Sequence, residues 1–304
     1  MSPFFLSTRT SVLGALALAT AVGLTACGGA ADAGDPTAGA SSSGSAKAPF
    51  FSELPAAIQS AGTVNVASNV EYPPFESFDT DGKTVVGIDR ELADALEKKL
   101  GVKFEFNNIA FDAIIPGLDS GRYDMGISAM SDTVERQKQV SFLDYFEAGG
   151  GIMTTTANPH GIKALGDLCG LKVGIVKGTT EDADAAAQST ECQSAGKPAL
   201  ETTIYAGQNQ AVLALQSDRV DAFLVDSTSG SVVAAESKGE LAMGNRYQQM
   251  PFGLVFPKDS MVLMGVVQKA MEEIAADGTY KSVLEKYKMG DHAVDKFTVN
   301  GVTK

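Results

Sequence analysis

The chain has 304 residues, 44% of them hydrophobic, and a formal net charge of −13 at pH 7. This acidic balance argues against a nucleic-acid-binding protein, which needs basic side chains to neutralise phosphates. The length and the hydrophobic content are sufficient for a substantial core divided between two compact lobes.

The first 26 residues have the composition of a secretory signal. Residues 11–26 carry no charge and follow a single positive charge at Arg9. The run is shorter than the about 20 apolar residues that a membrane-spanning helix needs. It ends in a Leu-Thr-Ala-Cys sequence at Cys27 that resembles a bacterial lipobox, so we expect cleavage after residue 26 and lipid on the Cys27 sulfur. The alternative is an ordinary signal peptide with a chance cysteine.

Residues 27–54 follow as the lipidated cysteine and a linker. Most of this stretch is rich in Gly, Ala and Ser and offers almost nothing to bury, which is typical of flexible chain. No later segment is long and apolar enough to span a bilayer. We therefore expect a protein held at the extracytoplasmic face of the cell membrane by its lipid anchor only.

Two further cysteines, Cys169 and Cys192, remain in the exported part of the chain. In an oxidising compartment, a disulfide between them is the default. A metal site is a weaker alternative, because the only histidines are His160 and His292 and neither lies at ligand spacing from the cysteines. We expect no metal and no cofactor.

Strands and helices alternate along the next part of the chain. Apolar residues recur every four positions through residues 88–100, which predicts an amphipathic helix capped by Asp89 at its start and ended by Gly101. The alternation predicts a parallel sheet covered by helices. The predicted strands are 64–68, 102–106 and 124–128, and a second helix is predicted at 112–120.

The chain contains an internal repeat. Residues 118–124 and 215–221 have similar sequences, and each precedes a buried strand. Residues 172–176 read as the opening strand of the second copy. We interpret this as two α/β lobes that face one another across a ligand crevice, with coincidence in a short motif as the alternative.

Two crossings between the lobes are expected, near residues 149–153 and 250–254. Three glycines precede a strand-like run at the first of them. Lobe one would then comprise residues 55–151 and 252–300, and lobe two residues 152–251.

Seven short motifs occur in order between residues 64 and 287. They are EYPPFE at 71–76, VGID at 86–89, FDAIIPGL at 111–118, SDTVER at 131–136, VSFLDY at 140–145, GTT at 178–180 and DGTY at 277–280. Each is weak alone, but together they make the chain resemble the bacterial extracellular solute-binding proteins of the polar amino acid type. The resemblance implies an α/β fold of two Rossmann-like lobes joined by a two-strand hinge, the type II periplasmic-binding-protein architecture.

The resemblance also implies that the protein binds a ligand and does not catalyse a reaction. The protein would be a monomeric receptor that binds a free polar L-amino acid and delivers it to the membrane permease of an ABC importer. A sensor that reports amino acids to a membrane signalling protein would have the same ligand site. A third alternative is a lyase similar to cyclohexadienyl dehydratase, for which Glu181 is the only candidate proton donor; Glu181 and Asp182 also suit the first turn of a helix.

Five matching positions suit the charges of a zwitterion. Arg136 would hold the α-carboxylate, because a guanidinium bonds a carboxylate at two points and stays charged. Ala129, Ser131 and Thr180 would add polar contacts, and Asp226 would take the α-ammonium. The alternatives are that Arg136 is a solvated helix charge, that Asp226 caps a helix, and that Thr180 is an N-cap.

Three further positions would surround the ligand's side chain. Tyr72 and Phe111 match positions that flank its aliphatic part, although both could be ordinary core. Asn69 stands where relatives selecting cationic side chains or glutamine often have aspartate. An uncharged amide favours glutamine or asparagine as the ligand. Lys177 and Glu181 border the cleft from lobe two and could change this choice.

Overall fold

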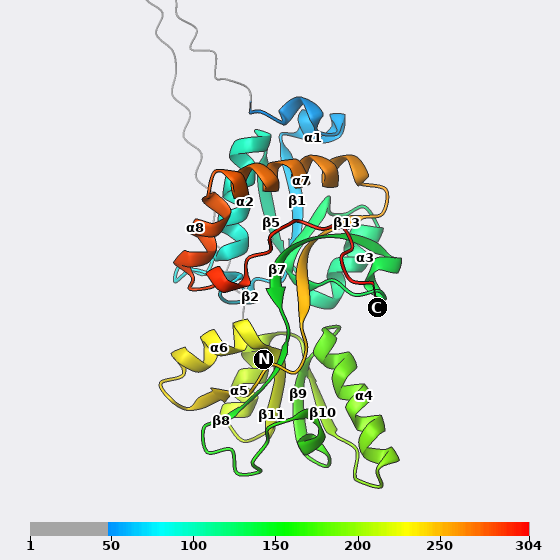
Figure 1. Ribbon diagram of the computed structural model, residues 1–304, viewed down its shortest axis with the longest axis vertical. Helices are drawn as coiled ribbons and strands as arrows, with labels where there is room; N and C mark the ends of the chain where they lie inside the picture. The colour runs from blue at the N-terminus through cyan, green and yellow to red at the C-terminus, as the bar shows by residue number, and fades with distance from the viewer. Residues whose placement is uncertain (1–47, 304) are drawn as a thin grey trace, which may run out of the picture. The chain divides into compact units, whose positions relative to one another are not determined.

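The computed structural model describes residues 48–303, and their chain is organised around two five-stranded sheets (Figure 1). The predicted signal, Cys27 and most of the predicted linker lie outside the described residues. Among residues 48–303, no helix has the length and apolar character needed to cross a membrane.

The sheet of lobe one has the strand order β5-β1-β6-β13-β7. β1 runs parallel to β5 and β6, whereas β13 is antiparallel to β6 and β7. Every residue of β6 is buried, as expected for a central strand covered on both faces. The strands are β1 (Thr63–Ser68), β5 (Lys103–Asn108), β6 (Met125–Ser131), β7 (Val140–Ala148) and β13 (Met250–Pro257).

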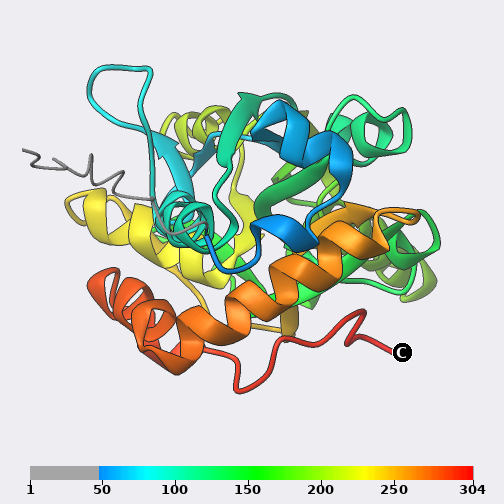
Figure 2. The ribbon, with the colours of Figure 1, turned by 90° about the horizontal axis from the view of Figure 1, so that it is seen from above.

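Helices cover both faces of this sheet. One core joins the sheet to α2, α7 and α8, and a second, smaller core lies between the sheet and α3. Figure 2 shows α7 and α8 in orange and red along one side. The short α1 and a small sheet of β2, β3 and β4 complete the lobe. Their bounds are α1 (Ala56–Ala61), β2 (Glu71–Tyr72), β3 (Glu76–Phe78), β4 (Val85–Val86), α2 (Ile88–Leu100), α3 (Ile114–Asp119), α7 (Met261–Ala276) and α8 (Thr279–Lys286).

The helix α2 confirms the predicted apolar stripe but not the predicted N-cap. It ends at Gly101 in the left-handed conformation, as its sequence predicts. At its start, the backbone N–H groups of Ile88 and Asp89 donate to the carbonyls of Pro74 and Phe75. Because these carbonyls already satisfy the first donors of the helix, the Asp89 side chain is not needed as a cap and is buried instead.

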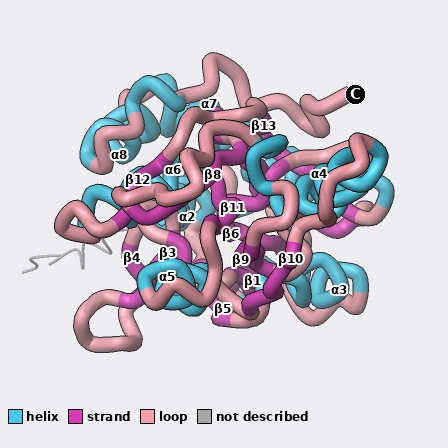
Figure 3. Tube along the Cα trace, turned by 90° about the horizontal axis from the view of Figure 1, so that it is seen from below, coloured by secondary structure: helices cyan, strands magenta, loops and turns pink. Residues whose placement is uncertain are grey.

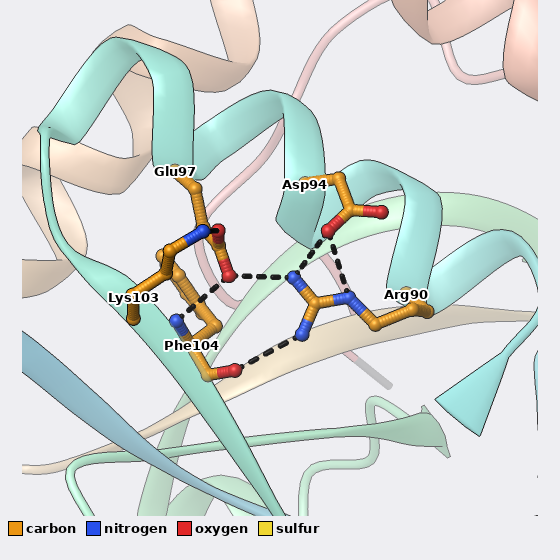
Figure 4. A network of polar contacts seen from close by, with 5 residues as sticks. All are labelled: Arg90, Asp94, Glu97, Lys103 and Phe104. Atoms are coloured by element: carbon orange, nitrogen blue, oxygen red, sulfur yellow. Dashed lines mark hydrogen bonds and ion pairs between the residues drawn. The ribbon is translucent and has the colours of Figure 1, made fainter. Parts of the chain in front are cut away.

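Charged side chains fasten α2 to β5 (Figure 4). Arg90 pairs with Asp94 and Glu97, each at 2.7 Å, and donates to the Phe104 carbonyl at 3.0 Å. Glu97 also accepts from the Phe104 N–H at 3.0 Å and pairs with Lys103 at 2.6 Å. The network therefore fixes the register between the helix and the edge strand that follows it.

The sheet of lobe two has the order β10-β9-β11-β8-β12. Its faces are covered by two cores, one with α4 and one with α5, and Figure 3 shows these helices on different sides of the strands. The elements are β8 (Gly150–Thr155), β9 (Lys172–Val176), α4 (Thr180–Ser194), β10 (Glu201–Tyr205), α5 (Gln208–Gln216), β11 (Ala222–Asp226), α6 (Ser227–Glu236) and β12 (Leu241–Met243).

A disulfide joins Cys169 and Cys192, with their Cα atoms 5.6 Å apart. It connects α4 to the 3-10 turn Leu165–Leu168 that precedes β9. Cys192 is buried within one of the lobe-two cores, so the bond lies inside the packed lobe.

Two segments cross between the lobes. The first crosses at Gly149, between β7 and β8, within the expected region. The second crosses between β12 and β13, at residues 244–249, so the expected return near 250–254 falls inside β13 instead. A Cβ on Gly149 would lie 1.9 Å from the Gln248 carbonyl oxygen, which shows that the two crossings touch and why a glycine occupies this position.

Candidate functional site

A cleft between the lobes contains all eight residues expected to bind the ligand. They are Asn69, Tyr72, Phe111, Ala129, Ser131, Arg136, Thr180 and Asp226. The first six come from lobe one, mostly from the carboxyl ends of its strands, and the last two from lobe two. The sheet topology thus brings together side chains that are far apart in the sequence.

Arg136 enters the cleft from the 3-10 turn Arg136–Lys138, which follows β6. Its guanidinium donates to the Ser131 carbonyl at 2.7 Å and to the Gly178 carbonyl of lobe two at 2.9 Å. The Phe111 ring lies against it, 5.6 Å from the guanidinium carbon to the ring centroid. No carboxylate of residues 48–303 forms an ion pair with it, and burial lowers the pKa of Arg136 to about 10. The charges of Glu181 and Asp132 oppose this lowering of the pKa, although neither carboxylate forms an ion pair with Arg136.

Asp226 ends β11 and is 3% exposed. It is the N-cap of α6: its carboxylate accepts from the backbone N–H groups of Thr228 and Ser229. It also accepts from the Gly149 N–H in the crossing segment at 2.9 Å. Burial raises the pKa of Asp226, while these hydrogen bonds oppose the rise. Asp226 therefore caps a helix, which was the alternative given in the sequence analysis, and the same carboxylate also lines the cleft.

Thr180 lies in the first turn of α4 but is not its N-cap. The cap is Thr179, whose hydroxyl accepts from the Asp182 N–H at 3.2 Å. The Thr180 hydroxyl instead donates to the neighbouring Glu181 carboxylate at 3.1 Å. Thr180 therefore presents its hydroxyl and backbone at the lobe-two side of the cleft.

Two aromatic side chains line the cleft and also pack on the hydrophobic cores. Tyr72 packs against core residues of both lobes, so it lies at the junction between them. Phe111 packs on the smaller core of lobe one. Asn69 lies beside them and donates from its side-chain amide to the Ile109 carbonyl at 3.0 Å. Part of its hydrogen-bonding capacity is thus used to hold the segment between β5 and α3.

Glu181 is a buried acid of the cleft, although its sequence context suggests an ordinary first-turn helix acid. It is 7% exposed, lines the cleft and forms no ion pair with any cation of the described chain. Burial and the nearby charge of Asp226 raise the pKa of Glu181 to about 7. The two acids in the first turn of α4 thus differ, because Asp182 does not line the cleft.

A second group of acids, of which Glu76 also lines the cleft, was not predicted from the sequence. Glu76 is fully buried and accepts from the Ser128 hydroxyl at 2.8 Å, and Asp89 accepts from the Tyr145 hydroxyl at 2.6 Å. Burial and the charge of Asp89 raise the pKa of Glu76 well above its ordinary value. Ser128 in turn accepts from the Asn69 N–H at 2.9 Å, which ties this group to the turn that carries Asn69. The sequence signal was the presence of both acids inside the motifs at 71–76 and 86–89.

Several polar contacts join the lobes across the cleft. Lys177 pairs with Asp112 at 2.7 Å, and the Ser229 hydroxyl donates to the Pro73 carbonyl at 2.6 Å. The Lys177 side chain is 64% exposed and does not line the cleft, unlike Glu181. These contacts describe a closed arrangement of the two lobes.

Other residues lining the cleft come from both lobes. They are Glu76, Ser128, Val176, Thr179, Glu181, Gln208, Phe223, Leu224, Val225 and Phe252. Within residues 48–303, no group of three or more His, Cys, Asp or Glu side chains could hold a metal ion.

The family model of the bacterial extracellular solute-binding proteins, family 3, matches residues 64–290. The chain therefore belongs to this family. Its fold is that of the type II periplasmic amino-acid-binding proteins, whose solved structures it resembles.

Among curated relatives, the arginine-binding protein ArgT of Corynebacterium glutamicum is 28% identical, with 81% of each chain covered. The ABC transporter arginine-binding protein 1 of Escherichia coli is 29% identical over 75% of this chain and 91% of the relative. A solved ancestral arginine-binding protein bound to glutamine is 35% identical, with a TM-score of 0.69 over 75% of this chain and 98% of that chain.

Proposed function

We propose that this protein is a receptor that binds one polar L-amino acid in the interlobe cleft and delivers it to the permease of an ABC importer. The observation that carries the proposal is that Arg136 and Asp226 reach the same cleft from opposite lobes. Arg136 binds the α-carboxylate and Asp226 takes the α-ammonium, with Ser131 and Thr180 beside them. A ligand held in this way bridges the two lobes and favours their closed arrangement.

The lipid anchor is part of the same proposal. Cys27 carries the lipid, and the Gly/Ser-rich stretch after it allows the lobes to reach a permease in the same membrane. The linker is shorter than the predicted range 27–54, because residues 50–54 pack on lobe one. The extracytoplasmic character of the family supports this location. The linker composition and the Leu-Thr-Ala-Cys sequence supply the rest of the argument.

The choice of side chain depends on the groups near Asn69. Taken alone, its neutral amide favours glutamine or asparagine, and one structural relative is an ancestral arginine-binding protein bound to glutamine. The curated relatives named above are arginine-binding proteins. Asn69→Asp adds a negative charge, so this variant should keep binding and shift its preference toward cationic side chains.

A thermal-shift screen against all common L-amino acids tests the proposal. One polar amino acid should raise the melting temperature. At a concentration 100 times Kd, its binding should add about 2.7 kcal/mol to the unfolding free energy. The proposal fails if no amino acid changes the melting temperature.

One observation favours a second candidate, a lyase. Glu181 is buried in the cleft with a pKa of about 7, which suits a general acid near neutral pH. A solved relative is described as an amino-acid-binding precursor of cyclohexadienyl dehydratase. However, prephenate, the cyclohexadienyl acid used in the test below, lacks an ammonium group and would leave Asp226 without a partner. Incubation with prephenate and detection of an aromatic product distinguishes the lyase from the receptor.

A further inference from the structure

The cleft contains more negative charge than a neutral amino acid can compensate. The ionisable side chains that line the cleft are Tyr72, Glu76, Arg136, Glu181 and Asp226. Glu76 accepts from the Ser128 hydroxyl at 2.8 Å, and burial raises its pKa, so Arg136, Asp226 and Glu181 are the groups to compare with the charges of the ligand. Arg136 matches the ligand's carboxylate and Asp226 its ammonium. Glu181 then remains as a buried acid that forms no ion pair with another part of the described chain.

Burying a charge without a partner is costly, so such a group either keeps its proton or receives a cation from the ligand. The only side-chain hydrogen bond to Glu181 in residues 48–303 comes from the Thr180 hydroxyl at 3.1 Å. The helix α4 adds the partial positive charge of its first turn. Neither supplies the full positive charge that a buried carboxylate requires.

Glu181 supplies from lobe two a negative charge that Asn69 does not supply from lobe one. Asn69 lies on the lobe-one side of the cleft and carries no charge, whereas Glu181 lines the same cleft from lobe two. The residue that contacts the ligand's side chain can therefore be Glu181 of lobe two, in place of a residue of lobe one. Because Glu181 lies on the lobe opposite Arg136, its attraction to the side-chain cation of a ligand held by Arg136 would also favour closure.

Resting on the proposed function, we infer that Glu181 is the specificity-determining residue of the cleft, and that it selects an L-amino acid with a second positive charge at the end of its side chain. The ligand class is thus a guanidino or diamino acid. This reverses the preference for glutamine or asparagine that Asn69 alone suggests.

The test compares L-arginine with L-citrulline, which has nearly the same shape but a neutral ureido group. Calorimetric titrations use the full-length chain purified in detergent. Wild type should bind arginine at least about 10-fold more tightly than citrulline. Glu181→Gln should weaken arginine binding by about 30-fold or more and change citrulline binding by less than about 3-fold.

Asp182→Asn is the matched control. It removes the same charge from the same helical turn but lies outside the cleft, and its amide oxygen can still accept from the Gly178 N–H. The arginine-to-citrulline ratio should be unchanged in this variant. Circular dichroism melting of each variant shows that the fold is retained.

Two results would overturn the inference while leaving the proposed function intact. One is that glutamine or citrulline binds wild type as tightly as arginine. The other is that Glu181→Gln weakens arginine and citrulline equally, because Glu181 would then act on the common α-ammonium. If no amino acid binds wild type at all, the proposed function fails as well.

Discussion

The guanidinium of Arg136 in lobe one donates a 2.9 Å hydrogen bond to the carbonyl of Gly178 in lobe two. The residue proposed to hold the ligand's carboxylate thus also holds the two lobes together. A second guanidinium nitrogen bonds Ser131 within lobe one at 2.7 Å, which fixes the direction of the side chain. Ligand binding and closure of the cleft therefore depend on the same group.

Asp226 should tolerate asparagine much better than alanine. Alanine removes the N-cap of α6 and leaves the buried Gly149 N–H without its acceptor, at a combined cost of about 2–4 kcal/mol of unfolding free energy. Asparagine keeps an oxygen for these donors but loses the charge for the ligand's ammonium. Urea unfolding should therefore separate the two variants, while both bind the amino acid weakly. Equal stability of the two variants would show that the cap contributes little.

The network around Glu97 should matter for stability more than its surface position suggests. Burial alone would raise the pKa of Glu97, but hydrogen bonds from Lys103, the Phe104 N–H and Arg90 lower it. Glu97→Ala should reduce the unfolding free energy by about 1–3 kcal/mol, because it removes acceptors from several donors at once. Glu135→Ala is the control. Within residues 48–303 Glu135 forms an ion pair only with the exposed Lys138, so this substitution should cost less than about 0.5 kcal/mol. Chemical unfolding of both variants gives the comparison, and similar losses would contradict it.

Asp144 should make the protein less stable as the pH rises. Burial and the charge of Asp132 raise the pKa of Asp144 to about 7. The folded state then holds a proton that the unfolded state releases near pH 4, so stability is lost between about pH 4 and pH 7, by roughly 4 kcal/mol at most.

Asp144→Asn isolates this effect from the other buried acids. Asparagine does not titrate, so the variant should gain stability relative to wild type as the pH increases from 4.5 to 8. Urea unfolding of both proteins across this range, without ligand, is the measurement. A stability difference that does not change with pH would show that Asp144 titrates normally.

The membrane anchor depends on a single sulfur. Cys27→Ser should abolish lipidation, so the protein should appear in the medium or remain as an unprocessed precursor. Fractionation of cells and labelling with a fatty-acid analogue give the answer. A variant that is still processed and still membrane-bound would show that Cys27 is not the anchor.

Local patterns in the sequence predicted local structure well. The four-residue spacing of Ile88, Leu92, Leu96 and Leu100 predicted α2, and all four side chains are almost fully buried. The alternation of strands and helices predicted a parallel sheet covered by helices, whereas both sheets also contain antiparallel strands. The repeat of residues 118–124 at 215–221 predicted the two lobes. Such features depend on near neighbours in the chain, so periodicity reveals them.

The surroundings of the buried acids could not be predicted from local patterns. Asp89 was expected to cap α2, but the backbone of Pro74 and Phe75 satisfies the helix start and leaves the side chain to bond Tyr145. Glu181 has the sequence context of a first-turn helix acid, yet it is buried in the cleft between the lobes. Burial of an acid depends on distant segments that fold over it, and a single sequence does not display those contacts.

The affinity of Arg136→Ala for the amino acid that stabilises wild type tests the central claim most directly. Calorimetric titration should show one binding site on wild type and binding at least about 100-fold weaker in the variant, because the ligand's carboxylate loses its buried partner. The melting temperature of the unliganded variant should stay near that of wild type. Binding of the same amino acid to Arg136→Ala with unchanged affinity would contradict the account.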